Sequence, residues 1–218
     1  MPRPLLAVAL LLVPPVALAA TNIDSWRLGS DGLATLANVQ GWYAVVPFLV
    51  AWAIAGGSPV RGTLVGGLEG LLSILAYYGY SWLVHGAHSA TSQLGASGAA
   101  WVVGATLGGF LYGGLGGLAG THPDRRPIVR AFAFSLTAAT IAAEAVLMIL
   151  GARRRFDLPG LEVAAAGLLV VATGLVALAW LRTGRTATLR ALLVAGVLGA
   201  AGFAVLLALE ERFAYPTL

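Results

Sequence analysis

The sequence contains no cysteine and no lysine, and charged residues make up only 10% of its 218 positions. The absence of cysteine excludes disulfide bridges, thiolate metal sites and cysteine nucleophiles. Soluble domains carry about 25% charged residues, whereas this chain combines its low charge with 59% hydrophobic residues and a mean hydropathy of +0.87. The composition therefore predicts an integral membrane protein.

The net charge of +4 and the isoelectric point near 10.0 do not indicate a nucleic-acid-binding protein. All 13 basic residues are arginines, and they lie in the short connections between apolar runs. Basic residues in such connections determine how a membrane protein is oriented. We therefore predict the lipid bilayer as a partner and no nucleic acid.

Seven apolar runs are separated by short polar turns. Because a spanning helix needs about 20 apolar residues, we predict an all-α polytopic transmembrane bundle of six or seven spans. Little chain remains for anything else, so residues 1–218 are predicted to form a single integral membrane domain. The runs are residues 4–20, 41–57, 62–84, 101–120, 128–150, 161–181 and 191–209.

The N-terminal segment has two interpretations. Residues 1–20 contain Arg3, an apolar run, the Pro14-Pro15 pair and small residues around Leu18, which are the parts of a cleavable signal peptide. The alternative is a retained first span that is short and kinked by the two prolines. Residues 21–40 mix polar and apolar side chains and are predicted to be an interfacial segment.

The distribution of arginines predicts the orientation. With seven spans and a cytoplasmic N-terminus, eight arginines lie on the cytoplasmic side and five outside, although the run at 153–155 opposes this bias. We predict a bacterial plasma-membrane protein with its N-terminus in the cytoplasm. The cytoplasmic set is Arg3, Arg61, Arg125, Arg126, Arg130, Arg182, Arg185 and Arg190.

A glycine-rich run occupies residues 101–120, where eight of twenty positions are glycine. Small residues at helical spacing let two membrane helices approach closely, so we predict that this run packs against the helix that carries Glu69. The alternative is that the glycines make room for a ligand, with Tyr112 as a polar group beside it. The glycines assigned to packing are Gly104, Gly108, Gly109, Gly113, Gly116 and Gly120.

Two acidic residues, Glu69 and Glu144, lie inside apolar runs. Ionisable groups inside a membrane are costly and indicate function by default. A structural alternative for Glu69 is solvation near the headgroups or pairing with Arg61. We predict that these acids and nearby tyrosines face an interior cavity as substrate-binding residues. The set is Glu69, Tyr77, Tyr80, Tyr112 and Glu144.

The sequence indicates no metal, cofactor or catalytic residue. His85 and His88 have a spacing that could share a helical face, but a catalytic zinc site usually has three protein ligands. No nucleotide fingerprint, HExxH sequence or nucleophile motif is present. An intramembrane enzyme is therefore the least favoured function.

Glycine- and aromatic-based patterns occur in a characteristic order between residues 34 and 150. They are Leu36-Ala37-Asn38 before Trp42, Glu69 followed by Tyr77-Tyr78, Trp101 with Gly104 and GGFLYGGLGG, an arginine-bearing turn, and Glu144. In this order the chain resembles a family of multi-pass actinobacterial membrane proteins known as a domain of unknown function. The resemblance implies a bacterial plasma-membrane protein and supplies no activity. In size and helix number alone, the chain is also similar to the substrate-binding membrane subunits of vitamin-type uptake transporters.

Two functions remain as hypotheses. The first is a small-solute carrier or substrate-binding membrane subunit, which uses the predicted cavity. The second is a non-catalytic membrane scaffold or accessory protein, in which the glycines serve packing and neighbours satisfy the acids. Either function is compatible with a homo-oligomer or with other membrane subunits as partners.

Overall fold

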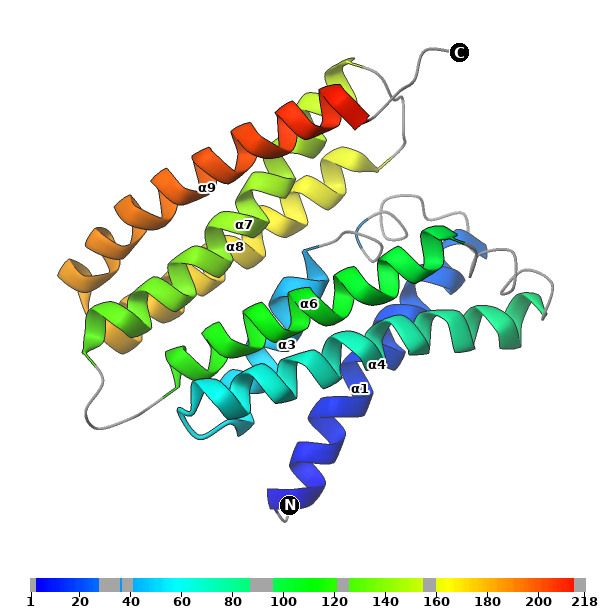
Figure 1. The fold of residues 1–218 in the computed structure, drawn as a ribbon, viewed down its shortest axis with the longest axis horizontal. Coiled ribbons are helices and arrows are strands. Elements are labelled where there is room, and N and C mark those ends of the chain that lie inside the picture. The colour runs from blue at the N-terminus through cyan, green and yellow to red at the C-terminus, as the bar shows by residue number, and fades with distance from the viewer. Residues whose placement is uncertain are drawn as a thin grey trace.

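The computed structural model describes residues 3–27, 36, 41–86, 96–120, 126–154 and 160–213. Within these residues the protein is all-α, with seven helices and no strand, as the sequence predicts (Figure 1). The helices are α1 (Arg3–Arg27), α3 (Trp42–Ile54), α4 (Pro59–His85), α6 (Ala96–Ala119), α7 (Pro127–Arg154), α8 (Leu161–Thr183) and α9 (Arg185–Phe213).

Several helix boundaries differ from the sequence prediction, among them those of α1 and α3. α1 continues past Pro14 and Pro15 to Arg27, so residues 21–27 are helical, whereas the sequence placed them in an interfacial segment. Most of the remainder of that segment lies outside the described residues. α3 has only 13 residues and is shorter than the predicted run of 41–57, because Gly56 and Gly57 turn the chain with positive φ angles of 59° and 79°.

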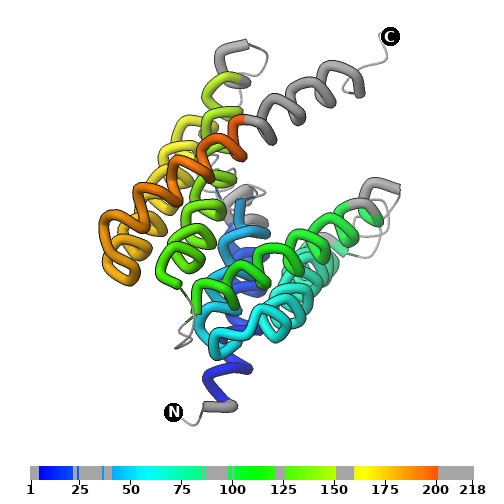
Figure 2. The backbone as a smooth tube through the Cα atoms, turned by 60° about the vertical axis from the view of Figure 1, so that its left-hand side comes forward, coloured from blue at the N-terminus to red at the C-terminus, as the bar shows by residue number. Residues whose placement is uncertain are grey.

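The helices form two groups (Figure 2). In the first, α4 packs most extensively on α6, α3 lies against both α4 and α6, and α1 lies against α4. In the second, α7 packs on both α8 and α9. The groups meet mainly where α6 and α3 contact α7, and a shared core of buried residues runs across this junction.

Backbone contact between α4 and α6 explains why the first group is tight. A Cβ placed on Gly66 would clash with the carbonyl oxygen of Gly109, and one on Gly113 would clash with the carbonyl oxygen of Gly62. A Cβ on Gly117 would lie 2.9 Å from the Cα of Pro59. Only glycine fits at these positions, because each neighbouring atom belongs to the backbone of the other helix. We call this contact the glycine seam.

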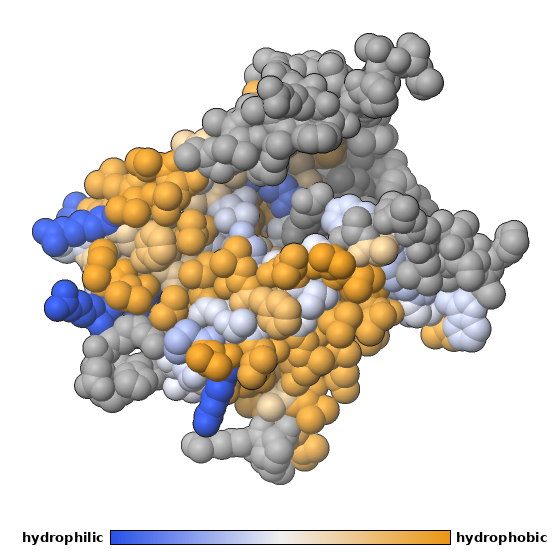
Figure 3. Space-filling model, in the orientation of Figure 1, coloured by the Kyte–Doolittle hydropathy of each residue, from blue (hydrophilic) through white to orange (hydrophobic). Residues whose placement is uncertain are grey.

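Apolar side chains cover much of the described part of the face shown in Figure 3. On α8 and α9 the exposed residues include Val170, Leu181, Leu193 and Val197. By length and composition, three helices in the described parts of the chain can cross a membrane, namely Trp101–Ala119, Pro127–Leu150 and Leu161–Thr183. An apolar exterior of this kind is what a bilayer requires.

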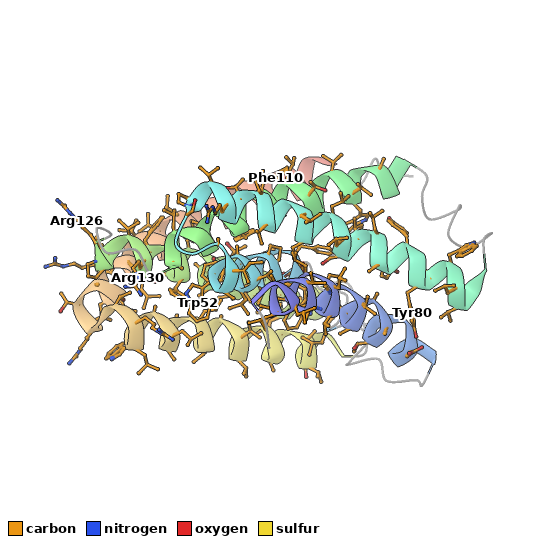
Figure 4. All side chains as sticks on the ribbon, turned by 90° about the horizontal axis from the view of Figure 1, so that it is seen from below. Trp52, Tyr80, Phe110, Arg126 and Arg130 are labelled. Atoms are coloured by element: carbon orange, nitrogen blue, oxygen red, sulfur yellow. The ribbon has the colours of Figure 1, made fainter. Side chains whose placement is uncertain are left out.

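Arginines gather at one end of the bundle, where α6 and α8 end and α7 and α9 begin (Figure 4). The Arg130 Nε donates a hydrogen bond of 3.4 Å to the carbonyl oxygen of Ala119, the last residue of α6. The Arg182 guanidinium lies 5.7 Å from the centre of the Trp52 ring. Cations beside helix C-termini are favourable because unpaired carbonyl groups point toward them.

Candidate functional site

A cavity of about 420 Å³ lies where α3, α6, α7 and α9 meet. It adjoins the middle of α6, α7 and α9 and the beginning of α3. Its volume is in the range of about 300–1,000 Å³ that is usual for small-molecule sites. The lining residues are Gly41, Tyr43, Ala44, Trp101, Gly104, Ala105, Gly108, Tyr112, Leu136, Thr140, Ala143, Glu144, Leu147, Leu198 and Gly199.

Two glycines of α6 line the cavity instead of packing against a helix. A Cβ on Gly104 would meet nothing within 4 Å, and the nearest atom to one on Gly108 would be the Tyr43 carbonyl oxygen at 3.8 Å. The sequence assigned both residues to helix packing. They differ from Gly109 and Gly113 because they lie on another face of α6, which α4 does not cover. Of the other two glycines assigned to packing, Gly116 meets the backbone of Phe48 and Gly120 meets that of Gly57.

The polar wall of the cavity comes from α6 and α7. The Tyr112 hydroxyl donates a hydrogen bond of 3.0 Å to Thr140 Oγ1, and Thr140 donates one of 3.1 Å to the Leu136 carbonyl oxygen. Glu144 lies one helical turn beyond Thr140 and also lines the cavity. A phenol, a hydroxyl and a carboxyl therefore lie along one side of an otherwise apolar space.

The beginning of α3 meets this wall. Gly41 precedes the helix, and a Cβ placed on it would lie 2.9 Å from Glu144 Oε2. The first amide groups of a helix lack intrahelical acceptors and favour negative charge nearby. The approach to α3 is fixed by Trp42, whose Nε1 donates a hydrogen bond of 2.7 Å to the Leu36 carbonyl oxygen.

The structure does not bring the five predicted substrate-binding residues into one cavity. Tyr112 and Glu144 line it, whereas Glu69, Tyr77 and Tyr80 lie on α4 and are not among its lining residues. The physical reason is that α6 uses one face for the glycine seam and another for the cavity. α4 contributes no lining residue among those described, although Tyr77 packs in the same small core as Tyr43 and Ala105, which do line the cavity.

Each of the three α4 residues has other surroundings. Glu69 is fully buried. Tyr77 makes an edge-to-face contact with Tyr78 at a ring separation of 5.6 Å and packs on a small core that contains Ile74 and Ala105. The Tyr80 hydroxyl donates a hydrogen bond of 2.9 Å to Asp24 Oδ2 of α1.

Sequence reasoning missed Tyr43, Trp101 and Thr140 as cavity residues. Tyr43 and Trp101 each stand near the start of an apolar run, where an aromatic residue is typical of an interface anchor. The position of Thr140 one turn before Glu144 was the available signal for a polar wall. No sequence pattern shows that α3 begins beside Glu144.

The described residues contain no group of three or more His, Asp or Glu side chains that could hold a metal ion. The candidate pair cannot be placed, since His88 lies outside the described residues and the His85 side chain is not described. Comparison with protein-family models, curated proteins and solved structures found no match to this chain. The family resemblance therefore stays a prediction, and the geometry of the cavity carries the functional argument.

Proposed function

We propose that the protein is a multi-pass membrane protein that binds a small, mainly apolar molecule in the cavity between α3, α6, α7 and α9, as a carrier or a substrate-binding subunit. The observation that carries this proposal is the polar wall of Tyr112, Thr140 and Glu144 in an apolar cavity of about 420 Å³. Apolar walls with a few convergent polar groups are typical of ligand sites.

The polar wall defines the class of ligand. Glu144 is the carboxyl group among the lining residues, and it lies one helical turn from Thr140, to which Tyr112 donates its hydroxyl proton. A carboxylate accepts hydrogen bonds from an ammonium group or another strong donor. We therefore propose an apolar ligand that carries one amine, with the amine directed toward Glu144.

The proposed membrane arrangement has seven crossings. Six use helices of 23 to 29 residues, which are long enough for a bilayer. The seventh uses α3, whose 13 residues reach about 20 Å at a rise of 1.5 Å per residue. The cavity then lies near the middle of the bilayer, as binding sites in transporters do.

We propose that the end with Arg126, Arg130, Arg182 and Arg185 faces the cytoplasm of a bacterial cell, which also places the N-terminus inside. The absence of cysteine allows single-cysteine labelling without background. In Thr186→Cys, at the arginine end, a membrane-impermeant maleimide should label the protein only after cells are permeabilised. In Ala99→Cys, at the other end, it should label intact cells. The opposite pattern would reverse the orientation.

Ligand binding tests the proposed function directly. We expect purified protein in lipid nanodiscs to bind radiolabelled 1-adamantylamine saturably. Glu144→Gln should weaken this binding about tenfold, because a hydrogen bond to a charged group contributes about 1.5–3 kcal/mol. Binding of the neutral counterpart 1-adamantanol should change little in the same variant. A scintillation proximity assay measures both affinities.

Two glycine variants complete the experiment. Gly104→Leu places a side chain in open cavity space and should weaken binding of both probes. Gly174→Leu on α8 also meets open space but is not a lining residue, so it should leave binding unchanged. If neither probe binds saturably, or if Gly104→Leu has no effect, the cavity is not a ligand site for this class. The glycine seam would then favour the alternative function, a non-catalytic scaffold or accessory protein.

A further inference from the structure

Glu69 is the most unusual polar residue in the first helix group. Its exposed fraction is 0%, and neither carboxyl oxygen has a hydrogen-bond partner in the structure. It stands between Gly66 and Gly70, whose backbones contact Gly109 and Ala105 of α6. The carboxyl group is therefore buried where two helix backbones touch, without any group that satisfies it.

No described basic group compensates Glu69. The titratable side chains described on the helices that pack against α4 are Asp24 of α1, Tyr43 of α3 and Tyr112 of α6, and α4 itself adds Arg61, Tyr77, Tyr78 and Tyr80. Asp24 accepts the hydrogen bond of Tyr80, and Tyr112 donates to Thr140. None of these side chains hydrogen-bonds to Glu69.

An ionised carboxylate is strongly unfavourable in such a place. Removal of a charge from water without a partner costs several kcal/mol or more, and proteins avoid that cost by neutralising or pairing the group. A metal cation would need several further oxygen ligands, and the described residues offer no cluster of acidic or histidine side chains. A proton needs only the carboxyl group itself.

Polar side chains on one face of α4 lie between the carboxyl and the end of the bundle. Ser73 lies four residues after Glu69, and Tyr80 lies eleven residues after Glu69. Both spacings return to nearly the same side of a helix. Ser73 is buried, and Tyr80 reaches the end of α1 to bond Asp24 (Figure 4). That end lies opposite Arg126 and Arg130.

We propose that Glu69 is a proton-exchange site in the membrane interior, separate from the ligand cavity. The buried carboxyl takes up and releases one proton, and the face with Ser73 and Tyr80 connects it to the end of the bundle at Asp24. Glu69 lies on α4, which contributes no described lining residue to the cavity. The inference is independent of the proposed ligand, because it concerns a group that does not line the cavity.

Infrared spectroscopy of the full-length protein in nanodiscs tests this proposal without any ligand. Near neutral pH, the wild type should show the C=O stretch of a carboxylic acid, and Glu69→Gln should lose that band. Glu144→Gln is the matched control on the cavity side and should keep it. As the pH is raised, the band should disappear reversibly while the amide bands show an intact fold.

Three results would overturn the proposal. A spectrum in which Glu69→Gln leaves this band unchanged would mean that Glu69 is ionised. A band that persists at every pH that preserves the fold would mean a permanently protonated structural group. Loss of the band on addition of sodium chloride, but not choline chloride, would mean a cation site.

A second set of measurements covers the case in which Glu69→Gln does not fold. The wild-type spectrum alone can then overturn the proposal, because absence of the carboxylic acid band excludes a protonated Glu69. Glu69→Asp keeps the acid but shortens its side chain, so it should shift the band without removing it. These outcomes leave adamantylamine binding untouched, so failure here is distinguishable from failure of the proposed function.

Discussion

Gly113→Leu is expected to abolish the folded protein. The Cβ alone would overlap the Gly62 carbonyl oxygen and would approach the Gly66 Cα, and both atoms belong to the backbone of α4. Flexible side chains can move away from an added atom, but a packed helix backbone cannot do so without displacing the whole helix. We therefore expect no monodisperse protein on size-exclusion chromatography in detergent.

The direction of this effect follows from two opposing contributions. Replacement of a helical glycine raises helix propensity by up to about 1 kcal/mol. Overpacking typically costs about 1–3 kcal/mol even where side chains can adjust, and here the obstacle is backbone. In a bilayer the apolar groups of separated helices are still in contact with lipid, so close packing is a main source of helix association. The free-energy cost of losing the glycine seam therefore exceeds the gain in free energy from the higher helix propensity.

Gly79→Leu provides the matched control. Gly79 is an exposed residue of α4, and a Cβ there would meet nothing within 4 Å. The same substitution should leave the elution profile and the melting temperature of the protein nearly unchanged. A normal yield and melting temperature for Gly113→Leu would show that the helices are not in backbone contact at the seam.

The all-α fold follows from the composition, because a bilayer leaves helices as the main way to pair backbone groups within one segment. The contact between the glycine run and the Glu69 helix follows from the spacing of the small residues. What spacing cannot show is which neighbour covers a given face. Gly104 and Gly113 lie nine residues apart and so on opposite faces of the helix, but their spacing does not show that one face lines a cavity and the other contacts α4.

The candidate site was predictable only in part for the same reason. Glu69 and Glu144 are both acids inside apolar runs, and the sequence analysis predicts that both face one interior cavity. The structure separates them because α6 lies between their helices. Tyr80 could not be placed either, since its partner Asp24 lies in a segment that the sequence assigned to the interface, whereas it is the last part of α1.

Phe134→Ala is expected to have the second largest effect on stability, because this side chain joins the two helix groups. Phe134 of α7 is fully buried, and its ring lies edge-to-face at 5.2 Å from Phe48 and 5.6 Å from Trp52, both on α3. Such ring pairs contribute about 0.5–1.5 kcal/mol each beyond the area they bury. Truncation removes both contacts and leaves a void at the junction.

The expected loss is about 2–3 kcal/mol, below the roughly 3–5 kcal/mol of Phe→Ala changes in soluble cores. The loss is smaller because helices that separate in a bilayer expose Phe134 to lipid and not to water. The free energy of transferring the side chain out of the core is therefore small, and the cost of the cavity left by the missing ring remains. Reversible unfolding in mixed micelles measures it, with Phe110→Ala as the control, because Phe110 is partly exposed and packs on Gly67 within the first helix group. If the two variants lost the same stability, the Phe134 cluster would not hold the two groups together.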